Sequence, residues 1–564
     1  MSPSLPDASW RRDLLLLVLV FGFVLGWRLG SAPLNNPDEG RYAEVPREMV
    51  ASGDWTMPQL NAVPYFEKPP FVYWIIAASE RFIGPGEWSL RLTPALFALG
   101  GILAAYAAVR RLYGRDAGFW AAIVLGTSLL YAALGRILLL DMPVSVLMSL
   151  TLFCFILGVE SPPGPGRRWF FYGLYASAAL ATLTKGLMGF LLTGAVMFLW
   201  LLVFNQWKRL LPMYLPSGLA LFFVIAAPWH FMAAARNPGW AHFYFIHEHL
   251  ERYTQAEGHG RYQPWWFFIP VLLLGLFPWT GFLVAALRDT VLGGWARRRE
   301  NATAWFFVTW AGFMFAFFSA SQSKLITYIL PVFAPLAVLI GRWLGSVLVL
   351  DEGFGRLKAG LRVFGFLCGL IAAALCVVVL KPGIIRDPLQ AAQLRPYAYA
   401  LAALLCAGGL RALVPTSSEG VGRGRSAAVS VAATAALMIA VLSYAAPIID
   451  QRSTRDIAQV ARSVVRPGDR VYHYHAFFHD FTYYTGQPVG LVNYQDELEL
   501  QFLDPKERAR RFIDDAAFRK EWAGTGRVFA VARIRDAAAL FADPDFHYHL
   551  VATGPHHYLF SNQP

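Results

Sequence analysis

The sequence predicts an all-α polytopic membrane domain of about 13 transmembrane helices, followed by a small α/β domain at the C-terminus. Hydrophobic residues make up 56% of the 564 residues, charged residues make up 15%, and the mean hydropathy is +0.43. That is more apolar side chain than a soluble core needs. A second observation is the number of separate apolar runs of about 20 residues, the length that crosses a bilayer as a helix. Together they exclude a disordered chain and an ordinary cytosolic enzyme.

The predicted spans follow one another along most of the chain, and we expect the first to be a retained helix rather than a cleaved signal peptide. It follows Arg11 and Arg12, and the later spans alternate sensibly between the two sides only if it stays. The spans cover 13–30, 88–109, 118–134, 142–159, 170–186, 187–204, 213–232, 265–287, 302–319, 327–346, 361–380, 398–413 and 427–446.

The distribution of basic residues predicts which loops lie inside. With a cytoplasmic N-terminus, each short inside loop is basic. These loops hold Arg110, Arg111, Arg115, Arg167, Arg168, Lys208, Arg209, Arg297, Arg356, Lys358, Arg423 and Arg425. The long loops 31–87 and 233–264 and the tail 447–564 then share the opposite face, which is the periplasm if the membrane is a bacterial inner membrane. We therefore divide the chain into a transmembrane catalytic domain, 1–446, and a periplasmic α/β domain, 447–564.

The tail is predicted to be a mixed domain because helical and strand-like patterns alternate in it. The helical patterns cover 455–465 and 505–522, and the strand-like ones cover 471–478, 528–534 and 547–552. The excess of 12 Lys and Arg over Asp and Glu is explained by sidedness. There is no long basic run, so we expect no nucleic-acid partner.

Ionisable residues on the outer side are the exceptions to this pattern, and we expect function among them. Asn36 and Pro37 resemble an N-cap and first-turn pair, which would begin a surface helix at Asp38 and Glu39. Arg41 and Tyr42 follow Asp38 at helical spacing, so an acid, a base and a phenol share one face. The alternative is that the carboxylates only complement the helix dipole.

Two further outer residues lie at the ends of spans. Asp141 precedes Met142 and Pro143, where it acts either as a helix cap or in catalysis. Lys185 ends an outward helix, where it either reaches towards the interface or has a functional role.

Four residues suggest a phosphate site at the outer leaflet. Lys68 lies in a loop before two prolines, where no helix requirement explains it. Lys324 and Tyr328 are four apart at the expected start of a helix, where an anion is favoured. Arg252 lies in the second long loop and completes the set.

A divalent metal site is a further hypothesis. Glu67 and His249, together with Glu248, could hold Zn²⁺, Mg²⁺ or Mn²⁺. Glu248 and Arg252 also share a helix face, so a surface ion pair is the alternative explanation for that segment. We expect no organic cofactor.

Several motifs together resemble the aminoarabinose transferases of lipid A, which are integral membrane glycosyltransferases of the type C fold related to the protein mannosyltransferases. The motifs are Pro37 to Glu44, Tyr65 to Pro69, Thr184 to Gly186, Glu248 to Arg252, and Lys324 to Leu330. They occur in order over most of the first 345 residues. Ile326 and Gly40 depart from the family pattern, in which proline and a larger residue are expected at these positions.

The resemblance implies that 4-amino-4-deoxy-L-arabinose moves from undecaprenyl phosphate to a phosphate of lipid A on the periplasmic side. It implies that Asp38, Asp141 and Arg41 act in catalysis, with Glu39, Lys185 and Tyr42 as weaker candidates. Lys68, Arg252, Lys324 and Tyr328 would bind the donor phosphate. A phosphate acceptor needs no general base, whereas a hydroxyl acceptor would need one such as Asp38 or Asp141.

Two alternatives remain open at this stage. One is a polyprenyl-phosphate glycosyltransferase that modifies protein or another envelope glycan. The other is a lipid or sugar transporter, which usually has repeated halves and charges near mid-membrane. Here the charges gather at one end of the spans. We expect a monomer whose partners are the lipid-linked sugar donor, the lipid A acceptor and membrane lipids.

Overall fold

The computed structural model describes residues 9–244, 246, 262–291, 295–350, 353–381, 383–385, 387–414, 420–495 and 497–564. The chain forms two compact units. The first comprises Met1–Leu29, Pro94–His230 and Phe245–Ala445, and the second comprises Gly30–Thr93, Phe231–Tyr244 and Ala446–Pro564. Helix α4 (Glu87–Tyr113) runs through the boundary between them.

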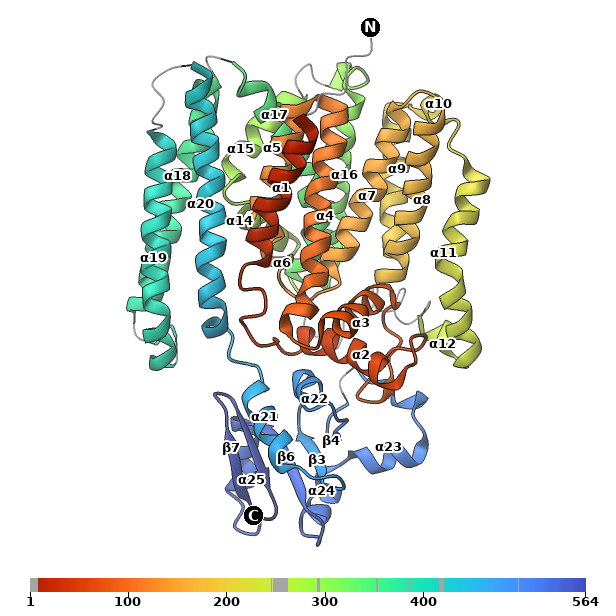
Figure 1. Ribbon diagram of the computed structural model, residues 1–564, viewed down its shortest axis with the longest axis vertical. Coiled ribbons are helices and arrows are strands. Elements are labelled where there is room, and N and C mark those ends of the chain that lie inside the picture. The colour runs from red at the N-terminus through yellow and green to blue at the C-terminus, as the bar shows by residue number, and fades with distance from the viewer. Residues whose placement is uncertain are drawn as a thin grey trace. The chain divides into compact units, whose positions relative to one another are not determined.

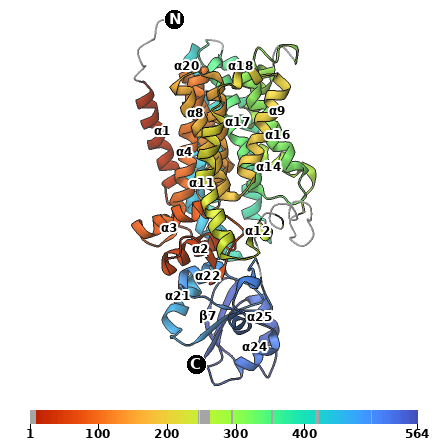
Figure 2. The same ribbon diagram turned by 90° about the vertical axis from the view of Figure 1, so that its right-hand side faces the viewer.

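The first unit is a helical bundle whose helices run side by side (Figures 1 and 2). Its helices are α1 (Ser9–Gly26), α5 (Arg115–Thr127), α6 (Leu129–Leu134), α7 (Asp141–Glu160), α8 (Pro165–Lys185), α9 (Met188–Phe204), α10 (Trp207–Leu210), α11 (Leu215–Arg236), α14 (Phe268–Gly275), α15 (Thr280–Val291), α16 (Ala302–Ala320), α17 (Phe333–Val347), α18 (Gly353–Leu380), α19 (Pro388–Leu413) and α20 (Gly420–Ile449). Three short 3₁₀ helices, η2 (Trp265–Phe267), η3 (Trp295–Arg297) and η4 (Ile326–Val332), join them.

All 13 predicted spans contain helix, and the predicted class of polytopic membrane protein is confirmed. Among the described residues, 8 helices are long and apolar enough to cross a membrane, or 9 if a bent pair counts as one span. The four remaining predicted spans are helical but less complete. Helix α9 is shorter, α5 and α6 are interrupted, and α1 and α8 carry arginines.

Three predicted continuous spans were wrong in detail. The span 118–134 is broken at Ser128, which has an extended backbone. The span 265–287 is bent by 104° between Gly275 and Thr280, a stretch that contains Pro278. The span 327–346 begins with the 3₁₀ helix η4 before α17. A proline removes a backbone donor, so it favours such breaks, and Pro331 also lies in η4.

Small residues bring α17 close to α5 in the bundle. A Cβ on Gly345 would lie 2.6 Å from the backbone nitrogen of Ala117, and one on Gly341 would contact the backbone of Ala121. Close approach of backbones through small residues four apart is a common way of packing helices in membranes, where apolar side chains gain little from each other over lipid.

The second unit joins a helical segment from the first long loop to the C-terminal α/β domain. The loop forms α2 (Asp38–Ser52), the hairpin β1 (Gln59–Leu60) with β2 (Val63–Pro64), and α3 (Phe71–Ile83). The short helix α12 (Trp240–His242) also belongs to this unit.

The C-terminal domain contains a six-stranded sheet in the order β5-β4-β3-β6-β8-β7, in which the first four strands are parallel. Its strands are β3 (Arg470–Tyr474), β4 (Gly490–Val492), β5 (Phe512–Ile513), β6 (Val528–Arg533), β7 (His549–Thr553) and β8 (His557–Ser561). Its helices are α21 (Arg455–Val464), α22 (His479–Thr485), η5 (Leu500–Phe502), α23 (Pro505–Arg511), α24 (Asp515–Trp522) and α25 (Ile534–Phe541).

The predicted α/β tail is confirmed as a class, although the predicted helix 505–522 was wrong. Two helices, α23 and α24, flank strand β5 there, and Asp514 caps the second by accepting a hydrogen bond from Ala517 N. The core of the domain is aromatic, with Tyr472, Phe518, Trp522 and Phe560 packed together.

Candidate functional site

The first turn of α2 pairs two of the predicted site residues. Arg41 Nη2 donates a hydrogen bond to Asp38 Oδ1 at 2.6 Å, as the spacing of three residues predicts. The Arg41 side chain is buried, whereas that of Asp38 is 50% exposed. The Tyr42 ring centroid lies 5.5 Å from the guanidinium carbon of Arg41. The predicted acid, base and phenol are therefore neighbours, with the carboxylate as the accessible member.

The predicted N-cap role of Asn36 was wrong. Helix α2 begins at Asp38, the cap position is Pro37, and no side chain caps the helix. The Asn36 side chain instead bonds to Asp480 of the C-terminal domain.

Glu39 lies inside the protein and is tied to its own loop. It accepts hydrogen bonds from Arg91 at 2.8 and 2.7 Å and from the Asn35 backbone N–H at 3.0 Å. Arg91 also donates to two backbone carbonyls of the loop, those of Ala32 and Pro33. This buried pair fixes the segment that leads into α2.

Glu67, Lys68 and Tyr65 form a second group of polar side chains in this unit. Lys68 Nζ lies 3.5 Å from Glu67 Oε2 and donates to the Glu67 carbonyl at 3.0 Å. Tyr65 Oη donates to Glu67 Oε2 at 3.4 Å. Burial, and then the charge of Glu67, raise the pKa of Tyr65 well above 10, so the phenol remains a neutral donor. Sequence reasoning missed Tyr65, although it lies within the Tyr65 to Pro69 motif.

Sequence reasoning also missed Glu497, which comes from the C-terminal domain and forms an ion pair with Arg41. No sequence signal links two residues so far apart in the chain. We refer to Asp38, Arg41, Glu67, Lys68 and Glu497 as the α2 cluster.

The helical bundle holds a separate group, the α7 cluster, formed by Asp141, Lys185 and Tyr328. Helix α7 begins at Asp141, and no side chain caps it. Asp141 Oδ1 accepts a hydrogen bond from Lys185 Nζ at 2.7 Å, and Lys185 Nζ lies 5.1 Å from the Tyr328 ring centroid. The capping interpretation of Asp141 and the interfacial one of Lys185 were therefore wrong, because the two side chains pair with each other.

Lys324 has a buried and well-defined ammonium group, but it does not form a helical pair with Tyr328. Leu325 has an extended backbone, so the predicted i, i+4 pair within one helix was wrong. Lys324 Nζ donates to the carbonyl of Gln263 at 2.9 Å and to that of Ser321. Neutral acceptors orient the charge without cancelling it.

The metal hypothesis falls largely on other parts of the chain. Glu248, His249 and Arg252 lie outside the described residues. Within the described part of the chain, no group of three or more His, Cys, Asp or Glu residues has the geometry of a metal site. Of the predicted ligands, the structure thus places only Glu67.

Each cluster combines opposite charges with limited solvent access. Such groups can orient a ligand that carries both an anionic phosphate and a cationic amine, and they can stabilise charge that develops during a reaction. Neither cluster contains a nucleophilic Ser or Cys paired with a histidine, so the arrangement favours positioning and electrostatics over covalent catalysis.

Comparisons with known proteins agree with this arrangement. Residues 67–231 match the family of dolichyl-phosphate-mannose-protein mannosyltransferases. An undecaprenyl phosphate-α-4-amino-4-deoxy-L-arabinose arabinosyl transferase of Edwardsiella ictaluri is 32% identical over 384 residues, which is 68% of this chain and 67% of that protein. The corresponding protein of Pectobacterium atrosepticum is 32% identical over 65% of this chain and 66% of its own length. The chain thus spans about two thirds of the length of these curated relatives.

The crystal structure of ArnT from Cupriavidus metallidurans bound to undecaprenyl phosphate has the same fold. It superimposes with a TM-score of 0.85 at 28% identity, covering 99% of this chain and 98% of that one. The apo structure of the same protein gives the same TM-score over 98% of each chain. Fold and relatives together define a multi-pass membrane glycosyltransferase.

Within that class the family is clear. The chain belongs to the undecaprenyl phosphate-α-4-amino-4-deoxy-L-arabinose arabinosyl transferases.

Proposed function

We propose that this enzyme transfers 4-amino-4-deoxy-L-arabinose from undecaprenyl phosphate to a phosphate of lipid A, on the periplasmic side of the bacterial inner membrane. The observation that carries the proposal is the match over nearly the whole chain to ArnT bound to undecaprenyl phosphate. The sugar comes from the names of the curated relatives. The acceptor and the sidedness come from the sequence motifs and the basic inside loops.

The charges of the substrates explain which residues the reaction needs. In the transfer, the bond from the anomeric carbon to the carrier phosphate breaks, and a bond from that carbon to an acceptor phosphate oxygen forms. The carrier phosphate changes from a diester to a monoester and gains a negative charge, while the acceptor phosphate loses one. No proton needs to move. The enzyme therefore needs cations beside the departing carrier phosphate more than it needs a general base.

We assign that role to Lys68, Arg252 and Lys324, with Tyr328 as a phenol donor. Lys324 suits it because its ammonium is held by neutral carbonyls and keeps its full charge. Lys68 is already partly balanced by Glu67, so it would contribute less unless Glu67 finds another partner.

Such a partner for Glu67 could be the divalent metal, which remains a proposal with His249 and Glu248 as its other ligands. A bound cation would offset negative charge near the phosphates. Metal analysis of the purified protein and of the Glu67→Gln variant would test this assignment.

We assign orientation of the sugar and the acceptor to the carboxylates. Asp38 is the accessible carboxylate of the α2 cluster, and Arg41 holds it in place from one side. Asp141 is paired with Lys185, and the ammonium of an aminosugar could take the place of that lysine. The proposed mechanism is a single displacement in which positioning supplies most of the rate.

The test is mass spectrometry of lipid A from cells that carry the wild-type protein or the Asp38→Asn variant. We expect a pentosamine-sized addition with the wild type and its loss with Asp38→Asn, at equal membrane abundance. Asp456→Asn is the matched control, because that carboxylate is 80% exposed on α21. Normal lipid A modification by Asp38→Asn would refute the assignment of Asp38. A wild-type protein that consumes the donor but leaves lipid A unmodified would point to another envelope acceptor.

A further inference from the structure

A buried carboxylate of the C-terminal domain holds the segment that leads into α2. Asp480 is fully buried at the second position of α22. Its oxygens accept hydrogen bonds from Thr454 N at 2.7 Å, Thr454 Oγ1 at 2.7 Å, Ser453 Oγ at 2.8 Å and the side-chain amide of Asn36. All four donors are neutral, and burying a carboxylate among neutral groups is costly. Asp480 thus links α22, the chain after α20 and the start of the α2 segment.

The contact with Asn36 runs in both directions. The Asn36 amide donates to Asp480 Oδ1, and Asn36 Oδ1 accepts from the Asp480 backbone N–H at 3.2 Å. Asn36 lies two residues before Asp38. A pair of reciprocal hydrogen bonds fixes the rotation of the amide as well as its position, because each end of the group has its own partner.

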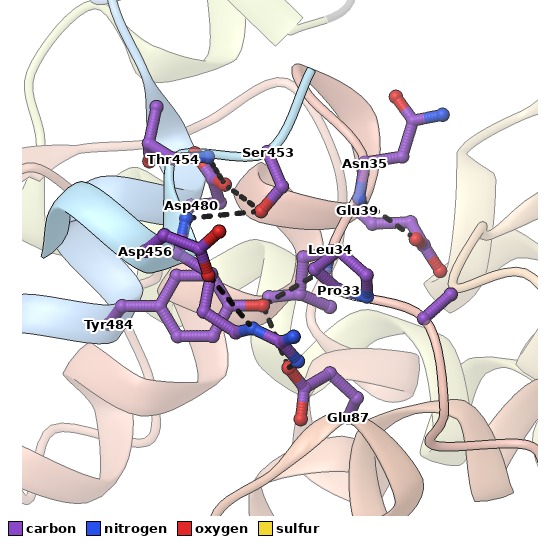
Figure 3. A network of polar contacts seen from close by, with 12 residues as sticks. Pro33, Leu34, Asn35, Glu39, Glu87, Ser453, Thr454, Asp456, Asp480 and Tyr484 are labelled. Carbon is purple, nitrogen blue, oxygen red and sulfur yellow. Dashed lines mark hydrogen bonds and ion pairs between the residues drawn. The ribbon is translucent and has the colours of Figure 1, made fainter. Parts of the chain in front are cut away.

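The residues before Asn36 are held as well (Figure 3). The Leu34 backbone N–H donates to Tyr484 Oη at 2.9 Å, and Tyr484 Oη donates to Glu87 Oε1 at 2.9 Å. The Asn35 backbone N–H donates to Glu39. Three consecutive residues are therefore fixed immediately before the first turn of α2.

The first turn itself packs backbone against backbone on α22. A Cβ on Gly40 would lie 2.5 Å from Asp480 N and 2.9 Å from the carbonyl carbon of His479. Both are backbone atoms, so neither can move aside cheaply. This contact explains why glycine stands where the family resemblance suggests a larger residue.

We infer that the C-terminal domain is a working part of the catalytic unit, in which Asp480 and Asn36 are positioning residues for the Asp38 carboxylate and the Arg41 guanidinium. Asp480 acts through Asn36 and does not itself touch the substrate. The Arg41 to Glu497 ion pair is a second hold by the same domain on the same turn. The inference rests on the proposed function, since it takes Asp38 to face the reacting groups.

The chain offers a matched control for Asn36. Asn61 makes the same reciprocal contact with the C-terminal domain, donating to the Val489 carbonyl at 3.1 Å and accepting from Val489 N at 2.8 Å. It is fully buried, but it lies in the β1–β2 hairpin and does not lead into α2. Because Asn61 has a φ of 56°, alanine there also adds backbone strain, so the control should lose at least as much stability.

The experiment measures steady-state transfer by the full-length purified protein, with undecaprenyl-phosphate aminoarabinose as donor and lipid A as acceptor. We expect kcat to fall about 10- to 100-fold for Asn36→Ala, with the donor KM within about three-fold, because misplacement by about 1 Å costs this much. For Asn61→Ala we expect a similar or larger fall in thermal stability with kcat within about two-fold. Equal losses of kcat in the two variants, or a normal kcat in Asn36→Ala, would overturn the inference.

A swap keeps the test valid if Asn36→Ala fails to fold. Asp480→Asn and Asn36→Asp should each lower kcat, and the double variant should recover much of that loss, because a carboxylate and an amide again face each other. Absence of recovery would also overturn the inference. Failure of the proposed function looks different, since lipid A would then remain unmodified by the wild type or Asp38→Asn would transfer normally.

Discussion

Replacing Glu48 with glutamine should stabilise the protein at neutral and alkaline pH. Glu48 lies buried on α2, where both oxygens accept from the Ala62 backbone N–H at 3.1 and 3.0 Å. Burial, and then the charge of Glu44, raise the pKa of Glu48 from its ordinary value of 4.5 to about 8. The buried side chain is therefore mostly protonated at pH 7, which glutamine mimics.

The sign of the pH dependence follows from proton binding. Between about pH 4.5 and 8, native Glu48 holds a proton that the unfolded chain releases. The free energy of unfolding therefore falls as pH rises through this window and is flat above it. At pH 7 the cost is about 3 kcal/mol, from roughly 2.5 pH units at 1.36 kcal/mol each. Burial also raises the pKa of Glu80 to about 7 and that of Glu44, so both add to the slope with the same sign.

The charged groups around Glu48 come from several elements, and they partly oppose this effect. Arg47 pairs with Glu44 at 2.6 Å and lowers the pKa of Glu48. Arg511, from the end of α23, is also close enough for its charge to interact with that of Glu48. Tyr483 donates to Glu80 at 2.8 Å and limits the rise in the pKa of Glu80.

The assay is thermal unfolding of the full-length protein in detergent at pH 5, 6.5 and 8. We expect Glu48→Gln to raise Tm by about 5–10 °C at pH 8 and to change it little at pH 5. Glu507→Gln is the control, since its side chain is 45% exposed on α23, and it should leave the profile unchanged. An equal loss of stability for Glu48→Gln at all three pH values would refute the reasoning, because it would show an ionised Glu48 that the fold needs.

Three further outcomes are expected. Asp141→Asn and Lys185→Met should each destabilise the protein, and the double variant should lose less than the sum by about 1–3 kcal/mol in Tm-derived stability, because each single change leaves a partner unpaired; additive losses would argue against the pair. Gly40→Ala should destabilise by about 1–3 kcal/mol from overpacking despite a gain of about 1 kcal/mol in helix propensity, whereas Gly22→Ala, whose Cβ meets nothing within 4 Å, should not. In a cysteine-free background, Gln501→Cys should react with an impermeant maleimide from the periplasmic side, while Lys208→Cys should react only after permeabilisation; the reverse pattern would invert the proposed topology.

The sequence could predict what depends on local spacing. The apolar runs located the helices of the bundle, and the spacing of Asp38 and Arg41 predicted their ion pair. The alternation of patterns after residue 446 predicted an α/β domain. Each of these signals is carried by neighbouring residues, whose geometry is fixed once the secondary structure is known.

The sequence could not predict partners that only the tertiary fold brings together. Asn36 satisfied a local rule for helix caps, but its amide is used by Asp480, 444 residues away. Asp141 likewise fitted a cap, while its carboxylate accepts from Lys185, 44 residues away. In both cases a stronger long-range hydrogen bond replaces the weaker local one, because the side chain can serve only one geometry. Gly40 was a visible departure, yet its cause lies in the backbone of α22.

The polar character of the contact between α2 and the C-terminal domain has a mechanical consequence. An apolar contact would gain free energy by area alone and would tolerate sliding of α2 along its partner. Asp480, Asn36 and Asn61 instead form hydrogen bonds that hold only in one register, at the cost of burying their polar groups. A segment that carries an accessible carboxylate in its first turn gains most from such a contact. Apolar packing could stabilise this unit equally well, but it would not fix the position of Asp38.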